Sequence, residues 1–264
     1  MSGLIGRGDA VPLTLTNIPR IMRANGWRHG AALLETWFSH GAAVKPEYGA
    51  PVTDVISMDW ALSFRRVRQV YDHLMQERVW LEPEIKRRIG DVLERRNLLH
   101  AEAVSFGDLA RPTEEIDADC VHAALVRGWP PLDDLFAALG DFSLRVAVAG
   151  TVEPVWWTRR SGRKTTERKL VAHRVTLTEV GVYVRGSYDF DGARSLGAWD
   201  EATNAVSWGD PAAGELVTTA QFRDWRDRNR MGGDFLIYSD VKRTRLTNES
   251  ARSFTIQATD WLFA

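Results

Sequence analysis

The clearest periodic pattern in the chain is a run of apolar residues, spaced three or four positions apart, between residues 59 and 78. Its members are Trp60, Phe64, Val67, Tyr71 and Leu74. Residues with this spacing share one face of an α-helix, which completes a turn about every 3.6 residues. The pattern therefore predicts a helix from about Asp59 to Arg78.

Further helices are predicted in the same half of the chain. One begins at Asn17, a residue type that caps helix N-termini, and ends near Gly26. Another begins at Pro83, because the first turn of a helix tolerates a residue without a backbone N–H. The remaining predicted helices span residues 31–40, 118–126 and 132–139, and residues 45–55 are predicted to form a loop.

Near residue 141 the pattern changes to alternation. Leu144, Val146 and Val148 alternate with less apolar residues, which predicts a β-strand because successive side chains point to opposite faces. Further strands are predicted at 170–177, 180–184, 205–208, 235–241 and 253–256, with one helix at 218–231. The sequence thus predicts an α+β protein, in which a helical N-terminal subdomain (residues 1–140) packs on a mainly antiparallel, β-rich C-terminal subdomain (residues 141–264).

The composition is that of an ordinary globular protein: 264 residues, 44% hydrophobic and 26% charged. No apolar run approaches the roughly 18 residues that a membrane-spanning helix needs, and the N-terminus lacks the basic and apolar regions of a signal peptide. We therefore expect a cytoplasmic protein with no membrane partner. The single cysteine, Cys120, excludes an intrachain disulfide. Eleven tryptophans are unusual, and most are expected in the core.

The net charge of −1 conceals a strong segregation of charge along the chain. Residues 108–141 carry eight acidic and two basic side chains, and residues 187–210 carry five acidic and one basic. Residues 159–174 carry seven basic and one acidic. Such segments can pair within the molecule, form solvated faces or steer a charged protein partner. The basic stretch 156–164 is predicted to be a hairpin tip, but the overall charge argues against nucleic acid as the main ligand, so no direct nucleic-acid binding is expected.

No recognised catalytic or cofactor motif occurs. The chain has no G-x-S-x-G elbow, no phosphate-binding glycine loop and no histidine pair at metal-binding spacing. We therefore expect no enzyme activity, no metal and no cofactor. One alternative stays open: Glu167 and Lys169 match the E-x-K half of a restriction-endonuclease core, and Asp141 would then be the second carboxylate holding a divalent metal.

Three segments together resemble a known bacterial family. They are residues 180–191 (VGVYVRGSYDFD), 195–200 (SLGAWD) and 232–240 (GGDFLIYSD). The family consists of otherwise uncharacterised proteins encoded beside type VI secretion spike and toxin genes. At least one member is the immunity protein of a secreted toxin with a restriction-endonuclease-like nuclease domain. The resemblance is densest over residues 170–245 and brings no catalytic signature.

The resemblance implies an immunity protein that binds and neutralises a type VI secretion nuclease toxin by protein–protein contact. The partner would be the nuclease domain of the cognate toxin, whose cleft must attract phosphate and is therefore basic. Acidic segments suit such a partner, and a buried aromatic residue would supply an anchor. The predicted toxin-binding residues are Glu114, Glu115, Asp117, Asp189, Asp191, Trp199 and Asp200. Two alternatives stay open: an enzyme, either a metal-dependent nuclease or another secreted effector, and a chaperone or adaptor that loads an effector onto the secretion spike.

Overall fold

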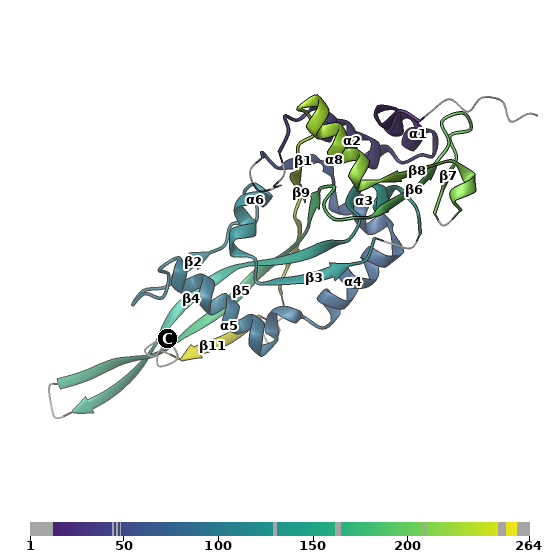
Figure 1. Cartoon of the computed structure of the whole chain (residues 1–264). Helices are drawn as coiled ribbons and strands as arrows, with labels where there is room; N and C mark the ends of the chain where they lie inside the picture. The colour runs from purple at the N-terminus through teal and green to yellow at the C-terminus, as the bar shows by residue number, and fades with distance from the viewer. Residues whose placement is uncertain are drawn as a thin grey trace, which may run out of the picture. The chain divides into compact units, whose positions relative to one another are not determined.

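Short helices and strands of very different lengths follow one another along the chain (Figure 1). The computed structural model describes residues 13–43, 45, 47, 49–128, 131–161, 165–208, 210–247 and 252–257. The fold contains both helices and antiparallel strand pairs, which confirms the α+β class predicted from the sequence. Among these residues, no helix is long and apolar enough to cross a membrane.

The chain divides into two compact units, each assembled from three separate segments. Unit 1 comprises Met1–Ile56, Arg127–Phe142 and Arg185–Tyr238. Unit 2 comprises Ser57–Val126, Ser143–Val184 and Ser239–Ala264. The predicted division between residues 140 and 141 separates two consecutive halves of the chain. In the structure, by contrast, each unit takes segments from both halves. The segments of the two units alternate along the sequence, because segments that are distant in sequence pack together within each unit.

Unit 1 combines helices from the start of the chain with strands from its second half. Its helical elements are η1 (Leu15–Asn17), α1 (Ile18–Ala24), α2 (Arg28–Ser39), α7 (Asp134–Leu139), η5 (Pro211–Ala213) and α8 (Thr219–Asn229). Its strands are β1 (Val52–Ile56), β6 (Ser195–Trp199), β7 (Val206–Ser207), β8 (Glu215–Thr218) and most of β9 (Phe235–Ser239). Strand β6 pairs with β7 and β8. Strand β9 runs antiparallel to the end of β5 (Thr165–Tyr188), where Tyr188 faces Phe235.

Aromatic rings form the core of unit 1. Phe190 and Phe222 stack with their ring centroids 3.9 Å apart. Trp37 is fully buried and meets these two rings edge-on at 4.8 and 5.6 Å. Gly232 lies beside Trp37 with a φ of +93°, and a Cβ at this position would lie 2.4 Å from the indole ring. This turn therefore requires glycine for both its backbone conformation and its space.

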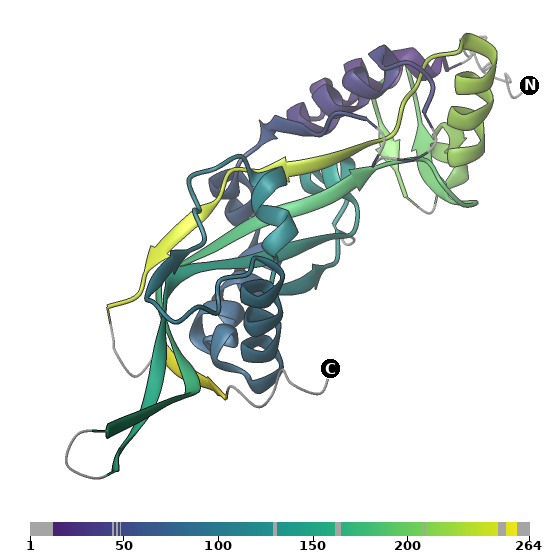
Figure 2. The same cartoon turned by 90° about the vertical axis from the view of Figure 1, so that its left-hand side faces the viewer.

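Unit 2 is built on the two longest strands, β5 with 24 residues and β4 (Phe142–Ser161) with 20. Its helical elements are α3 (Met58–Ser63), α4 (Arg65–Gln76), η3 (Val79–Leu81), α5 (Pro83–Arg95), α6 (Thr113–Ile116) and η4 (Asp117–Asp119). Its other strands are β2 (Val104–Phe106), β3 (His122–Val126), β10 (Lys242–Arg245) and β11 (Ser253–Gln257). Strands β2 and β3 pair with β4, whereas β10 and β11 pair with successive stretches of β5 (Figure 2).

The helix predicted over residues 59–78 is two helices. Helix α3 begins after Ser57, whose hydroxyl accepts a hydrogen bond from the Trp60 N–H at 3.1 Å. Phe64 then adopts an extended backbone, with φ −87° and ψ 127°, and α4 begins at the next residue. Apolar residues keep their helical spacing across this break, so the pattern alone does not reveal it.

Two other local predictions are wrong. Residues 118–126 were predicted to form a helix. In the structure, residues 118 and 119 are the last two of η4, and residues 122–126 form β3. The Val121 N–H just before β3 donates to the Val146 carbonyl of β4 at 2.8 Å. The predicted loop at 45–55 contains most of β1. Short apolar runs do not distinguish helix from strand, and pairing with a neighbouring strand decides between them.

Candidate functional site: an aromatic cavity in unit 1

Unit 1 contains a cavity of about 550 Å³ lined mainly by aromatic and aliphatic side chains. Helices α1, α2 and α7, the end of β5 and strand β6 all contribute to its wall. Trp27, Phe136, Phe190 and Trp199 are among its large rings. Cavities of this size, with apolar walls and a few polar groups, are the usual form of binding sites for small molecules and for single side chains of a partner.

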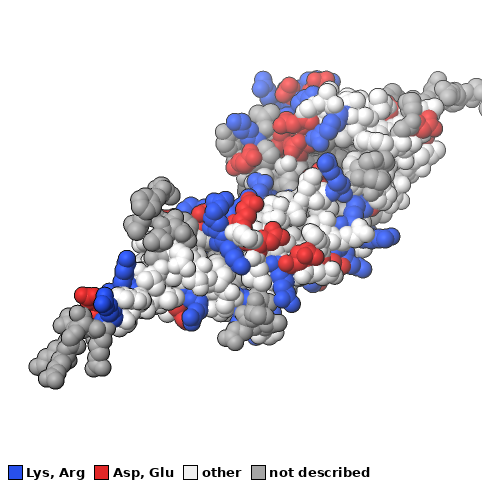
Figure 3. Space-filling model, turned by 90° about the horizontal axis from the view of Figure 1, so that it is seen from below, with Lys and Arg blue, Asp and Glu red and all other residues white. Residues whose placement is uncertain are grey.

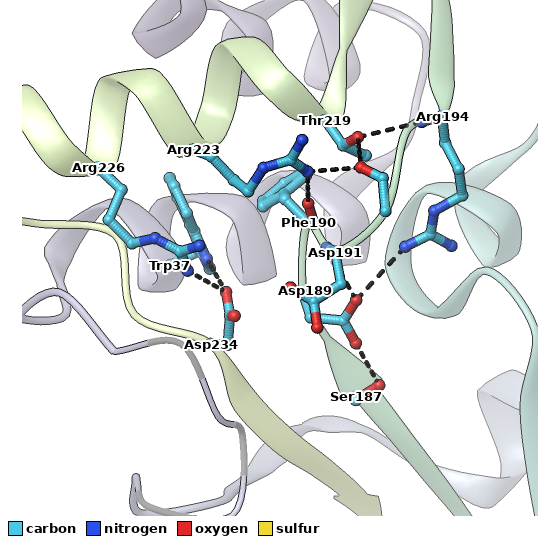
Figure 4. Close-up of polar contacts among 11 residues, drawn as sticks. Trp37, Ser187, Asp189, Phe190, Asp191, Arg194, Thr219, Arg223, Arg226 and Asp234 are labelled. Carbon is cyan, nitrogen blue, oxygen red and sulfur yellow. Dashed lines mark hydrogen bonds and ion pairs between the residues drawn. The ribbon is translucent and has the colours of Figure 1, made fainter.

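The loop after β5 forms a polar part of the wall, and Asp189 fixes its conformation (Figure 4). The Asp189 carboxylate accepts hydrogen bonds from the Ser187 hydroxyl at 2.6 Å and from the Arg194 guanidinium at 3.4 Å. It also accepts the backbone N–H of Asp191 at 3.4 Å. One carboxylate thus joins the end of the strand to both parts of the loop, which is a common use of aspartate in turns.

Helix α8 holds the same loop. The Arg223 side chain donates to the carbonyl oxygens of Phe190 and Gly192 at 2.6 and 2.5 Å. The Thr219 hydroxyl donates to the Gly192 carbonyl at 2.7 Å and accepts the Arg194 backbone N–H at 3.1 Å. These contacts hold the loop that carries Phe190, whose ring stacks on Phe222.

Next to this wall lies a buried polar cluster of Asp234, Trp37 and Arg226 (Figure 4). Asp234 Oδ1 accepts the Trp37 indole N–H at 2.8 Å and the Arg226 guanidinium at 3.0 Å. Burial raises the pKa of Asp234, although the Trp37 hydrogen bond and the Arg226 charge oppose this shift. Asp234 Oδ2 is buried with no hydrogen-bond partner among the described residues. The cluster fixes the orientation of Trp37, which supports Phe190.

The rim of the cavity mixes aromatic and charged groups. Trp208 is exposed and meets Phe136 edge-on, with ring centroids 5.4 Å apart. Asp141 also lines the cavity, and its carboxylate accepts the Arg127 guanidinium and the Gly128 N–H, both at 2.9 Å. The lining therefore combines apolar rings with an ion-paired carboxylate at an exposed position.

Four of the predicted toxin-binding residues lie in unit 1: Asp189, Asp191, Trp199 and Asp200. Asp189 and Trp199 line the cavity. Trp199 is only 5% exposed, and its indole N–H donates to the Leu196 carbonyl at 2.9 Å. Its ring meets Trp27 edge-on at 6.1 Å. Trp199 is therefore part of the cavity wall and does not project from the surface as an anchor.

Asp191 is exposed, whereas Asp200 holds a turn of its own. Asp200 accepts the backbone N–H groups of Ala202 at 2.8 Å and Thr203 at 3.2 Å. A hydrogen bond from the Thr203 side chain and these backbone bonds lower the pKa of Asp200.

The other three predicted residues, Glu114, Glu115 and Asp117, belong to unit 2. Asp117 accepts the Arg145 guanidinium at 2.7 Å and the Tyr183 hydroxyl at 2.8 Å. Its carboxylate is therefore a structural group and not a solvated surface charge. The Glu115 carboxylate lies 3.5 Å from the Arg111 guanidinium, and the Glu114 side chain is exposed.

The residues of the nuclease alternative are divided between the units. Asp141 belongs to unit 1, whereas Glu167 and Lys169 are exposed residues of β5 in unit 2. In the part of the chain that the structure describes, no three or more His, Cys, Asp or Glu side chains are grouped to hold a metal ion.

Sequence reasoning missed several residues that build the cavity. Trp27, Phe136 and Trp208 line it, and Arg223 holds its loop. The high tryptophan content was the available signal. A count of rings does not show which of them meet, because their contacts join segments that are distant in sequence.

The chain is similar to the alpha-1,4-glucan:maltose-1-phosphate maltosyltransferase of Myxococcus xanthus (strain DK1622), with 26% identity over 179 residues. The match covers 64% of this chain and 27% of that protein, so it spans about a quarter of the relative's length. No solved structure matches the chain. A profile described as "Family of unknown function (DUF6402)" matches residues 13–219 and 212–254. Because this match spans most of the sequence, the chain belongs to the DUF6402 family.

Proposed function

We propose that the protein is an immunity protein that neutralises a type VI secretion nuclease toxin by binding the toxin's nuclease domain through the aromatic cavity of unit 1. The cavity of about 550 Å³ is the observation that supports this proposal. Its lining includes Tyr188, Phe190 and Trp199, which lie in the segments that resemble the family encoded beside toxin genes. The residues that carry the resemblance thus include part of the cavity wall.

A preformed aromatic cavity suits tight binding of a protein partner. Binding energy at interfaces is concentrated in a few apolar or aromatic side chains that enter well-packed pockets. The wall around Phe190 is already held by Asp189, Thr219 and Arg223, so little conformational freedom is lost when a partner binds. In this proposal an apolar side chain of the toxin enters the cavity, and polar contacts at the rim surround it.

Acidic side chains have a smaller role in this proposal than the sequence alone suggested. The basic cleft of a nuclease is attracted by exposed acids, which raise the association rate. Asp191 is exposed and meets this requirement. Asp117 and Asp189 are paired with Arg145 and Arg194, so their charges are largely balanced within the molecule. The cavity would therefore govern the dissociation rate, and Asp191 the association rate.

Neutralisation by contact requires no catalytic group, metal or cofactor. In this proposal the protein acts in the cytoplasm, where it meets the incoming toxin domain, and is not an enzyme.

The test is binding to the nuclease domain of the toxin encoded by the neighbouring gene. Ser195 lines the cavity at an exposed position, so Ser195→Trp obstructs the cavity without removing a core side chain. Ala202→Trp adds the same ring at an exposed position of unit 1 outside the cavity lining. We expect wild type and Ala202→Trp to bind and protect cells equally. We expect Ser195→Trp to bind at least about tenfold more weakly, a loss of about 1.4 kcal/mol.

Each other outcome has a defined meaning. Failure of the wild-type protein to bind the toxin domain contradicts the immunity proposal. Normal binding by Ser195→Trp shows that the cavity is not the site that binds the toxin. A complex that leaves the toxin's nuclease activity intact indicates a chaperone or adaptor. DNA cleavage by the purified protein with Mg²⁺, abolished by Glu167→Ala or Lys169→Ala, indicates the enzyme alternative.

A second candidate function is binding of an α-glucan in the same cavity. The similarity to a protein named as a maltosyltransferase favours it, and rings such as Trp27 and Trp208 suit the apolar faces of sugars. Titration calorimetry with maltoheptaose tests this candidate. Binding that is lost in Trp208→Ala but kept in Leu216→Ala supports it, since Leu216 is an exposed residue of unit 1 outside the cavity lining. Absence of binding by the wild-type protein excludes it.

A further inference from the structure

The long strands of unit 2 extend past the rest of its sheet as a two-stranded ribbon (Figures 1 and 2). Strand β2 pairs with β4 as far as Val152, and β11 pairs with β5 from Ala172 onward. Beyond these points, no third strand pairs with β4 or β5 among the described residues. We name the described residues 153–161 and 165–171 the β-arm. Two strands without a third are marginally stable in water, so a partner that covers the β-arm would stabilise it.

The side chains of the β-arm divide between two faces. The Arg168 guanidinium lies over the Trp156 ring, 4.6 Å from its centroid, which places both residues on one face. Because side chains alternate along a strand, Trp157, Arg159 and Lys169 share the opposite face. Trp157 is 47% exposed, and Arg159 and Lys169 are exposed as well. This face thus presents an exposed indole together with two cations.

The charge of this region contrasts with that of the whole chain. Residues 153–171 of the sequence contain six Lys or Arg and two Glu, although the net charge of the protein is −1. Figure 3 shows basic side chains on the described part of the β-arm. The basic side chains that the structure describes there are Arg159, Arg168 and Lys169. A local excess of positive charge attracts polyanions even when the molecule as a whole is near neutrality.

We propose that the β-arm binds nucleic acid, with Trp157 stacking on a base and Arg159 and Lys169 pairing with phosphates. Aromatic rings combined with cations are the usual means of binding single strands without sequence preference, and a two-stranded ribbon also fits the major groove of a duplex. This proposal replaces the expectation of no direct nucleic-acid binding, which rested on the net charge. It does not depend on the proposed immunity function.

Two other polyanionic surfaces fit the β-arm less well. A membrane surface requires an apolar face opposite a charged one, but Arg168 occupies one face and Arg159 and Lys169 the other. An acidic protein surface matches the positive charge but offers no row of planar bases for the exposed indole of Trp157.

The experiment is fluorescence anisotropy of the full chain with a labelled 20-nucleotide oligo(dT) and a labelled 20-base-pair duplex, over a series of salt concentrations. We expect the Kd for oligo(dT) at physiological salt to be about 1–100 µM, as for other non-specific binders, and to be lower at low salt. Trp157→Ala should weaken binding about 5- to 150-fold, and Trp157→Phe should restore most of it by retaining a ring. Arg159→Gln with Lys169→Gln should reduce the slope of log K against log salt by about 1.4, since each lost phosphate contact contributes about 0.7.

Matched controls separate the β-arm from the rest of the surface. Trp208→Ala removes an exposed tryptophan of unit 1, and Arg87→Gln with Arg88→Gln removes two exposed cations of α5. Both controls should bind as wild type. The proposal is overturned by absence of binding at low salt, or by equal losses in control and β-arm variants that circular dichroism shows to be folded. It is also overturned if anionic phosphatidylserine vesicles or polyglutamate bind the β-arm while neither oligonucleotide does.

Discussion

The two units hold the same chemical arrangement at different depths: a carboxylate between an arginine and an aromatic donor. In unit 1, Asp234 accepts hydrogen bonds from Trp37 and Arg226. In unit 2, Asp117 accepts them from Tyr183 and Arg145. The side chains of Asp234 and Arg226 are 0% and 4% exposed, whereas those of Asp117 and Arg145 are 11% and 22% exposed.

The comparison shows how burial changes what an ion pair contributes. Two ions removed from water lose hydration, and their attraction compensates for this only if the remaining polar atoms are satisfied. Asp234 Oδ2 lacks a hydrogen-bond partner among the described residues, as does Arg145 Nε in unit 2, so the two clusters differ mainly in exposure. Burial raises the pKa of Asp234. We infer that the unit 1 cluster serves mainly to position Trp37 behind the aromatic wall. The unit 2 cluster, which keeps some contact with solvent, contributes to stability at a lower desolvation cost.

The largest expected effect is that of removing the buried cation of unit 1. Arg226→Leu leaves the Asp234 carboxylate buried without its arginine, and breaking such a pair costs about 3–5 kcal/mol of unfolding free energy. Urea denaturation followed by circular dichroism measures it. The double variant Arg226→Leu with Asp234→Leu should recover part of the loss, because no charge remains buried. A loss below about 1 kcal/mol in the single variant would contradict the assigned role of burial.

The equivalent change in unit 2 should have a smaller effect. Arg145→Leu leaves Asp117 with the Tyr183 hydroxyl and with access to water, so we expect a loss of about 1–3 kcal/mol. The same urea titration measures it. If Arg145→Leu destabilises the protein as much as Arg226→Leu does, the difference in burial does not govern the two clusters.

Removing a single hydroxyl should have a smaller effect again. Tyr183→Phe keeps the buried ring and deletes the hydrogen bond to Asp117, which typically contributes about 0.5–1.5 kcal/mol. Thermal denaturation compares it with wild type, and Tyr188→Phe serves as a control at a second buried tyrosine. A loss above about 3 kcal/mol would show that the hydroxyl organises more of unit 2 than this bond.

The smallest predicted effect is the pH dependence that Asp234 introduces. Burial raises its pKa above the ordinary value of an aspartate, so the folded state binds this proton more tightly than the unfolded state. The resulting stabilisation is complete below the unfolded pKa and is lost as the pH rises through the folded pKa. We therefore expect the stability of wild type relative to Asp234→Asn to fall as the pH rises above about 4 and through the folded pKa. A relative stability that instead increases with pH would show that Arg226 and Trp37 lower the pKa.

Several elements were predictable because their signals are local. Pro83 and the spacing of Ile85, Ile89 and Val92 predict α5, and all three apolar residues are buried. Helix α8 was placed to within about two residues of its observed ends, and its start is stabilised by a capping box between Thr218 and Gln221. Of the hairpin tip predicted at residues 156–164, residues 156–161 belong to strand β4, and residues 162–164 lie outside the described residues.

The candidate site was predictable only in part. The resemblance directed attention to the segments around Asp189 and Trp199, and both residues line the cavity. The charge pattern was a poorer guide to the binding residues, because it predicted that Asp117 lies on the surface as a free acidic group. Its pairing with Arg145 and Tyr183 joins residues 28 and 66 positions away, and no local pattern contains that information.

The sequence by itself determined the α+β class, the positions of most helices and strands, and the segregation of charge along the chain. These features depend on backbone preferences and on neighbours within one or two turns. Only the tertiary structure decided that the units interleave, that Trp199 forms a cavity wall, and that Trp37 meets Asp234 from 197 residues away. The physical reason is that cavities and buried polar clusters arise where segments distant in sequence pack together. Their energies depend on which side chains meet, and this is set by the fold of the whole unit.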